Sequence, residues 1–249
     1  MNDAAGNSSH PTPDTAAARL DRFIESLLDD RRQSHRLRSL IATSPLDTTH
    51  VEIDGKRYVN FASNNYLSLS AHPRVIAAVQ KAIGDYGFGS GASALISGHT
   101  PAHESAARAI AQWKQTEAAV LLPSGYQANF AAIQTLAAIA KQSGRGVHFF
   151  ADKLVHASIL DALMSGGLDV RIFPHNNLGQ LQKRLARVSG DDLSVVVTES
   201  IFSMDGDAAD LHGLAKLKRE HPFVFMLDEA HASGVYGPAG AGLAHELGL

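Results

Sequence analysis

Cysteine is absent from this sequence, so disulfides and thiolate metal sites are excluded. An excess of charge is absent too: 22 Lys and Arg face 25 Asp and Glu, a formal net charge of -3. Such a balance gives no electrostatic footprint for nucleic acid or an anionic membrane surface. No apolar run approaches the roughly 20 residues that cross a bilayer. We therefore expect no nucleic-acid, membrane or metal partner, and a cytoplasmic location.

Several familiar motifs are present only in part. Asp228-Glu229-Ala230-His231 spells a helicase-like box, but the phosphate loop that such proteins need is missing. Gly89 to Ala94 loosely matches a dinucleotide-binding loop, yet it follows a predicted helix rather than a strand. His99 and His103 have helical spacing without the glutamate of a zinc protease motif. A serine nucleophile elbow does not occur either. These function classes are disfavoured.

The chain has 249 residues, 45% of them hydrophobic, which is ample for a packed core. Residues 1–18 are rich in small and polar residues and are predicted to form a disordered tail. Residues 19–65 form a second segment. In it, apolar spacing predicts a surface helix over Leu20 to Ile41, and Asp54-Gly55 predicts the turn of a hairpin over Val51 to Val59.

Residues 66–249 alternate between short apolar runs and helical patterns. The predicted strands are Ala118–Leu122, Val147–Ala151, Val170–Phe173, Leu193–Thr198 and Phe223–Leu227. The predicted helices begin at His72-Pro73 and at Pro101, and cover Gly125–Ala140, His156–Met164, Leu178–Val188 and Leu211–Arg219. This alternation is typical of an α/β fold with a mostly parallel sheet and helices on both faces.

Ligands of such sheets bind beyond the carboxyl ends of the strands, and polar segments follow four of the predicted strands. Ser124-Gly125-Tyr126 joins a strand to a helix, where backbone amides favour a phosphate, although Ser124 is also a good helix cap. Asp228 follows an apolar strand, and a carboxylate there needs a cation or strong donors. Either a protonated ring nitrogen of a cofactor or a structural salt bridge would meet that need.

Taken together, the motifs resemble the α-oxoamine synthases, a family of fold-type I pyridoxal-phosphate enzymes. The stretches that carry the resemblance are Asn60–Leu67, Gly89–Ser93, Leu95–Gly98, Ser124–Asn129, Asp152 to Ser158, Thr198–Asp207 and Asp228–His231. Their order and spacing cover nearly everything from Leu20 to Leu249. The resemblance implies pyridoxal 5′-phosphate as cofactor and a fold-type I large domain over residues 66–249.

The resemblance also implies roles for individual residues. The implied catalytic residues are His156, Asp228 and His231. The implied cofactor-binding residues are Ser124, Gly125, Tyr126, His156, Glu199, Ser203, Asp228 and His231. In the family pattern, Asp228 keeps the pyridine nitrogen protonated so that the ring accepts electrons, and His156 stacks on the ring. Arg38 matches an arginine that binds a substrate carboxylate, with a solvated helix face as its alternative, and Asn64 lies beside the substrate.

The family reaction is a decarboxylative condensation of an amino acid with an acyl-CoA or an acyl-carrier-protein thioester. The segment Ser93–Gly98 is most similar to that of 8-amino-7-oxononanoate synthases, which act in biotin synthesis. An arginine is common in the family where Ala94 stands, so the sequence departs here from the family pattern, and the resemblance leaves the acyl specificity open. Glycine C-acetyltransferase, 5-aminolevulinate synthase and serine palmitoyltransferase activities remain open.

The family's Schiff-base lysine lies beyond the segment that matches Asp228–His231, but the last lysine of this chain is Lys218. The family's small C-terminal domain has no counterpart either. We therefore expect a fragment of a longer enzyme, a homodimer when full length, that is inactive as residues 1–249. A non-catalytic remnant is the alternative.

Overall fold

The computed structural model describes residues 15–247. The chain divides into two compact units, Met1–Ala62 and Ser63–Leu249, and each is considered by itself. In the first unit, helix α1 (Ala16–Gln33) begins after Thr15, whose side chain accepts a hydrogen bond from the Ala18 amide. The predicted tail is therefore wrong at its last three residues, which are helical. The part of the tail before Thr15 lies outside the described residues.

Helix α1 is shorter than predicted because His35 adopts a left-handed conformation, with φ of 55°. The amides of Arg36 and Leu37 then both bond to the carbonyl of Arg31, which ends the helix. The predicted hairpin is confirmed. Strands β1 (Ser44–Pro45), β2 (His50–Ile53) and β3 (Lys56–Val59) form an antiparallel sheet. Asp54 and Gly55 both have positive φ, at 49° and 73°, as a type I′ turn requires.

The second unit opens with helices that precede the sheet. These are η1 (Leu69–Ala71), α2 (Pro73–Tyr86), the π-helical turn η2 (Ala94–Gly98), α3 (Pro101–Lys114) and α4 (Gly125–Gln142). Pro73 and Pro101 each occupy a first helical position, where the missing N–H has no helical partner to lose. The predicted starts of α2, α3 and α4 are therefore confirmed.

A four-stranded parallel sheet forms the centre of this unit, with strand order β5-β4-β6-β7. Its strands are β4 (Val147–Asp152), β5 (Asp169–Phe173), β6 (Leu193–Glu199) and β7 (Val224–Asp228). Its connecting helices are α5 (Ala157–Met164), α6 (Leu178–Leu185) and α7 (Leu211–Glu220), followed by η3 (Pro238–Gly240) and α8 (Leu243–Glu246). The predicted α/β class with a mostly parallel sheet is confirmed.

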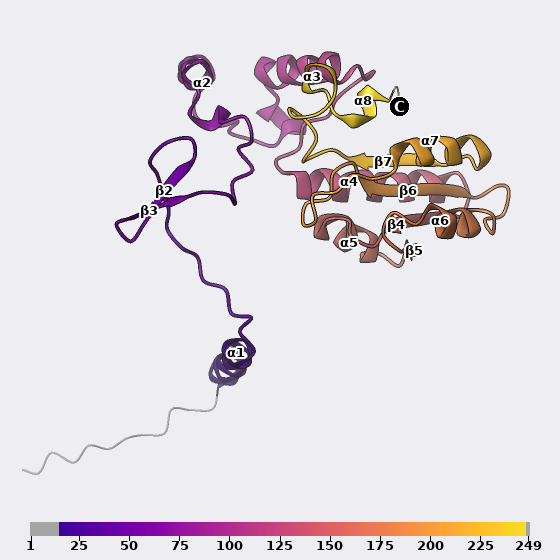
Figure 1. The fold of residues 1–249 in the computed structure, drawn as a ribbon, viewed down its shortest axis with the longest axis horizontal. Helices are drawn as coiled ribbons and strands as arrows, with labels where there is room; N and C mark the ends of the chain where they lie inside the picture. Colours follow the sequence, from indigo (N-terminus) through magenta and orange to yellow (C-terminus); the bar gives the residue numbers. More distant parts are fainter. Residues whose placement is uncertain (1–14, 248–249) are drawn as a thin grey trace, which may run out of the picture. The chain divides into compact units, whose positions relative to one another are not determined.

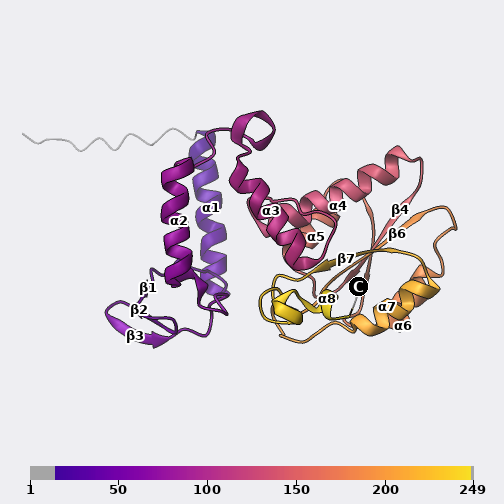
Figure 2. The ribbon, with the colours of Figure 1, turned by 90° about the horizontal axis from the view of Figure 1, so that it is seen from above.

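Helices cover both faces of the sheet, as Figures 1 and 2 show. Along β6, Val195 and Val197 pack on one face with α4 and α5, while Val196 packs on the other with α6 and α7. All three valines are 0% exposed, which explains why this strand has no polar side in the sequence. The buried core lies on these two faces, so the carboxyl ends of the strands are held rigidly.

One predicted strand is absent: Ala118–Leu122 has no regular secondary structure and pairs with no strand in the described part of the chain. Val120 is 82% exposed, so its apolar character does not reflect burial here. A strand needs a hydrogen-bonded neighbour, and propensity alone does not supply one. The apolar residues of α1 and α2 are also largely uncovered, and no residue of either helix is buried. Among the described residues, no helix is long and apolar enough to cross a membrane.

Candidate active site

A pocket of about 240 Å³ lies where several strands of the sheet end. Its walls come from α4, from the start of α5, from the last residues of β6 and β7 with the segment after β7, and from the segment before η1. The lining residues are Asn64, Gly125, Tyr126, Asn129, His156, Ser158, Glu199, Asp228, Ala230 and His231. Seven of the ten residues with an implied cofactor or substrate role therefore meet in one place, which is the carboxyl edge predicted from the sequence.

The sheet itself places two carboxylates side by side in this pocket. In the parallel ladder between β6 and β7, Glu199 is the register partner of Asp228. The amide of Ser200 donates to the Asp228 carbonyl at 2.8 Å and continues the ladder. Both acids end their strands, so their side chains leave the apolar core at the same level. The spacing of the two acids is thus fixed by backbone pairing.

The Asp228 carboxylate is oriented by two donors. Its Oδ1 accepts a hydrogen bond from the Ala230 amide at 2.9 Å, and its Oδ2 accepts one from Nδ2 of Asn129 at 2.9 Å. Among the described residues, no Lys or Arg forms a salt bridge with this carboxylate. The structural salt bridge that the sequence left open is therefore not seen, and the carboxylate retains acceptor capacity toward the pocket.

Glu199 is the most deeply buried acid of the pocket, at 2% exposure. Its Oε2 accepts from the Ser203 amide at 3.2 Å, while its Oε1 is buried and has no partner among the described residues. Burial raises the pKa of Glu199, and the negative charge of Asp228 raises it further. Backbone amides of His156 and Ser203 oppose this shift. An unpartnered buried oxygen beside an open pocket indicates room for a donor from a ligand.

His156 lies at the N-terminus of α5, after β4, and β6 separates that strand from β7, which ends at Asp228. Its Nδ1 accepts from the Ser158 amide at 3.2 Å and lies 2.8 Å from the Ser158 hydroxyl. A backbone amide only donates, so Nδ1 carries no proton and the ring hydrogen is on Nε2. The histidine therefore caps α5, and the hydrogen bond from the Ser158 amide holds its ring at the pocket.

The N-terminus of the 18-residue helix α4 forms another wall. Ser124 caps the helix by accepting from the Gln127 amide at 3.2 Å. The amides of Gly125 and Tyr126 precede the first intrahelical bond, so they are available to an anion. A Cβ added at Gly125 would meet nothing within 4 Å, so the space beside this turn is open. The Tyr126 hydroxyl donates to Asp161 at 2.8 Å, which raises the pKa of Tyr126.

His231 is held by a residue from the beginning of the same unit. The hydroxyl of Tyr66 lies 2.6 Å from Nδ1 of His231, and the two rings are 6.1 Å apart. The same hydroxyl lies 3.4 Å from Oδ1 of Asn64. Tyr66 therefore brings the segment before α2 to the end of β7, and Asn64 reaches the pocket wall through this contact.

Hydrogen bonds from the end of α3 hold the segment that follows Asp228. Nζ of Lys114 donates to Oε2 of Glu229, to Oγ of Ser233 and to the Ala241 carbonyl, at 2.9, 2.7 and 2.9 Å. The indole of the single tryptophan, Trp113, donates to the carbonyl of residue 239 at 3.0 Å. These bonds hold the chain between β7 and α8, and so hold Ala230 and His231 at the pocket.

The structure does not bring all predicted residues to the pocket. Ser203 is exposed and does not line it; only its backbone amide is involved, through Glu199. Ser124 does not line the pocket and contributes by capping α4. Arg38 belongs to the first unit, where it lines a separate hollow of about 570 Å³ with Asp30 and its neighbours. Its role toward a substrate carboxylate stays a prediction.

Three contributing residues received no role from the sequence: Asn129, Tyr66 and Lys114. Asn129 follows Gly125 by four positions, so helical spacing places it on the same face of α4. That spacing was available as a signal. Tyr66 and Lys114 contact residues 165 and 115 positions away, and nothing local in the sequence reports such pairs.

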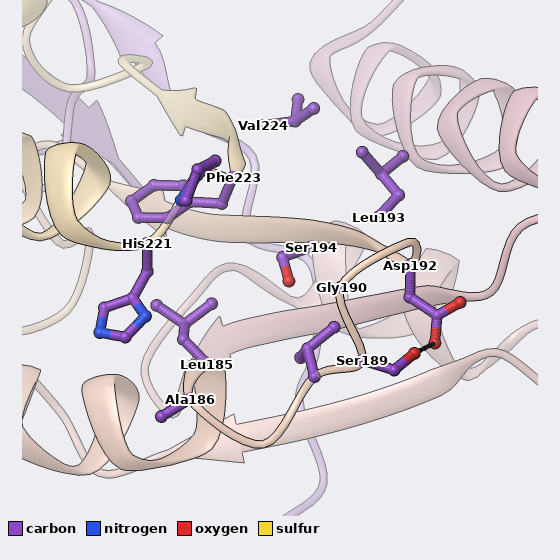
Figure 3. Close-up of a pocket in the computed structure, with 12 residues that line it drawn as sticks. Leu185, Ala186, Ser189, Gly190, Asp192, Leu193, Ser194, His221, Phe223 and Val224 are labelled. Atoms are coloured by element: carbon purple, nitrogen blue, oxygen red, sulfur yellow. Dashed lines mark hydrogen bonds between the residues drawn. The ribbon is translucent and has the colours of Figure 1, made fainter.

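A larger pocket, of about 560 Å³, lies at the opposite end of the sheet. Figure 3 shows Leu193 and Val224, the residues that begin β6 and β7, on its walls. The only hydrogen bond drawn between its lining residues runs from the Ser189 hydroxyl to Asp192, at 2.9 Å. This end of a parallel sheet is not where ligands of such folds bind, so size alone does not make it the site.

Comparisons with known proteins identify the family of the chain. The model of the family "Aminotransferase class I and II" matches residues 56–247. The 8-amino-7-oxononanoate synthase of Gluconacetobacter diazotrophicus is 42% identical over 235 residues, which are 92% of this chain and 58% of that protein. The chain thus spans little more than half the length of the curated relatives it matches.

Solved structures share the fold of the chain. A serine palmitoyltransferase from Sphingomonas wittichii superposes with a TM-score of 0.80 at 30% identity, over 94% of this chain and 57% of that one. A second serine palmitoyltransferase structure, described as containing PLP, superposes with a TM-score of 0.79 at 29% identity, over 94% of this chain and 57% of that one.

Proposed function

Since the chain belongs to the class I and II aminotransferase family, and within it to the α-oxoamine synthases, we propose that residues 1–249 contribute the cofactor-binding part of an enzyme that joins an amino acid to an acyl thioester. The observation that carries this proposal is the pocket that combines Asp228, His156 and the N-terminus of α4. A carboxylate, a flat imidazole and exposed amides are the groups that a phosphorylated pyridine requires.

The described residues fit pyridoxal 5′-phosphate. The Gly125 and Tyr126 amides suit its phosphate, because helix N-termini favour anions. The free acceptor capacity of Asp228 suits a protonated ring nitrogen. The unpartnered Oε1 of Glu199 offers an acceptor for a further donor in the pocket. His156, held at the wall by Ser158, suits stacking on the ring.

The cofactor, when bound, supplies an electron sink for charge that develops on an amino acid substrate. The chain's own residues prepare the site for it. Asp228 holds a proton on the ring nitrogen, the α4 amides hold the phosphate, and His231 with Tyr66 provides a hydrogen-bonding pair at the end of β7. The ladder between β6 and β7 keeps Glu199 beside Asp228. These groups orient a flat, charged ligand in one direction.

Within the family we favour 8-amino-7-oxononanoate synthesis, and thus a step of biotin synthesis. A curated relative with that name is 42% identical, which supports this choice. A solved serine palmitoyltransferase superposes with a TM-score of 0.80 and a solved 8-amino-7-oxononanoate synthase with 0.61, so the acyl group is the open part of the proposal. Ala94 lies on η2, outside the pocket lining. Four points stay predictions: the acyl thioester as substrate, the binding of a substrate carboxylate by Arg38, a cytoplasmic location and a homodimer.

Binding of pyridoxamine 5′-phosphate tests the cofactor assignment directly. This compound carries the ring nitrogen and the phosphate but forms no Schiff base with lysine. Wild-type 1–249 should bind it, and Asp228→Ala should weaken binding at least tenfold, because an ion pair with the ring is lost. Isothermal titration calorimetry gives both affinities.

A matched control separates this effect from a general loss of negative charge. Asp191→Ala removes an exposed carboxylate from the loop before β6, at the opposite end of the sheet, and should leave the affinity unchanged. Equal affinity for wild type and Asp228→Ala would refute the assignment.

The same polypeptide should be catalytically inactive. No lysine follows Lys218 in the sequence, so the residue that would hold the cofactor covalently is not among residues 219–249. Alanine and an acyl-CoA should therefore give no release of CoA. Lys153 lies three positions before His156 and is exposed. A borohydride-trapped adduct with pyridoxal phosphate, mapped to Lys153 by mass spectrometry, would overturn this expectation.

A further inference from the structure

Asn129 occupies the centre of a hydrogen-bonded chain that links two walls of the pocket. Its Nδ2 donates to Oδ2 of Asp228 at 2.9 Å and to Oγ of Ser158 at 3.0 Å. The Ser158 hydroxyl in turn lies 2.8 Å from Nδ1 of His156. The chain therefore runs from the carboxylate at the end of β7, through α4, to the imidazole at the start of α5.

The hydrogens of this hydrogen-bonded network can be assigned in one way only. A side-chain amide carries two hydrogens, and here each has its own acceptor, so the amide plane of Asn129 is fixed. Nδ1 of His156 already accepts from the Ser158 amide and carries no hydrogen. The Ser158 hydroxyl therefore donates to Nδ1 and accepts from Asn129. Ser158 is 0% exposed, so water does not compete for these positions.

We propose that Asn129 and Ser158 are positioning residues that hold Asp228 and His156 as one unit, with Asp228 turned toward the pocket and His156 kept in its Nε2–H tautomer. This inference rests on the proposed function, since it assigns Asp228 and His156 to the two sides of the cofactor. Neither Asn129 nor Ser158 requires contact with the cofactor for this effect. A fixed pair of this kind binds a flat ring without first having to order two free side chains.

The same helix contains an internal control for a purely structural role. Gln134, further along α4, donates from Nε2 to the Ala162 carbonyl and to Oγ of Ser165, both at 3.0 Å. Like Asn129, it therefore gives two hydrogen bonds, one of them to a serine at α5. Unlike Asn129, it donates to none of the residues that line the pocket. Asn129→Ala and Gln134→Ala each remove a hydrogen bond from α4 to a serine at α5, and only Asn129→Ala also removes a bond to Asp228.

The first experiment measures affinity for pyridoxamine 5′-phosphate in the 249-residue protein. Asn129→Ala should weaken binding about tenfold and Ser158→Ala several-fold, since a hydrogen bond to a charged group is lost in the first case and a neutral one in the second. Gln134→Ala should bind as wild type does. Equal affinities for Asn129→Ala and wild type, or equal losses in Asn129→Ala and Gln134→Ala, would overturn the proposal.

The second experiment uses the Asn129 side-chain amide as a spectroscopic reporter, which a merely structural role would not move. In ¹⁵N–¹H spectra, adding pyridoxamine 5′-phosphate should shift the Asn129 side-chain resonances, because Asp228 then shares its charge with the ring nitrogen. The Gln134 side-chain resonances should stay in place. Movement of both amides, or of neither while the ligand binds, would contradict the proposed unit.

Failure of the proposed function is distinguishable from failure of this inference. If wild type does not bind the ligand, the proposed function fails, but the reporter still works without it. Asp228→Asn keeps the shape and removes the charge, so it should move one Asn129 amide hydrogen, and Ser158→Ala should move the other. If neither substitution moves them, the hydrogen-bonded unit does not exist.

Discussion

Replacing Lys114 with Met should destabilise the second unit strongly and release the segment after β7. The ammonium group makes three hydrogen bonds, and the Lys114 and Glu229 side chains are only 20% and 13% exposed. Removing one partner of a fully buried pair costs about 3–5 kcal/mol, because the other charge is left unpaired. Partial exposure and the new apolar contacts of Met reduce that figure, so we expect about 2–4 kcal/mol.

Urea unfolding measures this loss, and Trp113 reports where it occurs. Its indole bonds to the same segment at residue 239, so the fluorescence of Lys114→Met should already differ from wild type before unfolding. The exposed Lys141→Met is the matched control and should change stability by less than about 0.5 kcal/mol. Glu229→Gln in the Lys114→Met background should cost less than it does in wild type, since the unpaired charge is then gone. A change below about 0.5 kcal/mol for Lys114→Met, or strict additivity, would refute the reasoning.

Three further substitutions test other parts of the unit. Burial and the Asp228 charge raise the pKa of Glu199, so the folded state retains a proton above pH 4.5 that the unfolded chain releases. The stability of the folded state therefore falls as pH rises, and Glu199→Gln should raise the urea midpoint more at about pH 8 than at about pH 5. Gly242 has φ of 100°, and a Cβ added there would lie 2.3 Å from the Glu229 carboxylate. Gly242→Ala should therefore lower the free energy of unfolding by about 1–3 kcal/mol in urea melts. The control Gly144→Ala, where φ is 70° and nothing lies within 4 Å of the added Cβ, should cost clearly less. Burial lowers the pKa of His175, but its partners Asp152 and Asp207 outweigh burial and leave the pKa raised. The stabilising contribution of His175 is therefore complete below pH 6.5 and is lost as pH rises through the raised pKa. His175→Asn should be most destabilising in acid, and a loss of stability that grows toward about pH 9 would count against this reasoning.

The periodic parts of the fold were predictable because they are determined by local physics. The apolar runs that became the central strands β4 and β6 are largely buried, and proline or a capping side chain marks the starts of α2 to α5. Ala118–Leu122 is apolar like those runs but has no partner strand in the part of the chain that the structure describes, and composition does not reveal pairing.

The site was predictable to the same extent. Gly125, His156 and Asp228 each follow an element boundary that the sequence marks, and the topology of a parallel sheet brings such boundaries together. The contacts that orient these residues were not predictable, because Asn129 and Asp228 are 99 positions apart. Ser203 follows its strand like the others, yet only its amide is used, since side-chain direction in a loop depends on contacts elsewhere.

The pairing of Glu199 with Asp228 makes the pocket dependent on a count of residues rather than on side-chain packing. Successive side chains of a strand point to opposite faces, so a slip of β7 by one position would turn Asp228 away from the pocket. The backbone ladder could re-form completely after such a slip, and circular dichroism would not register the difference. A single-residue insertion or deletion within β7 would therefore give a chain with normal secondary-structure content and no usable site.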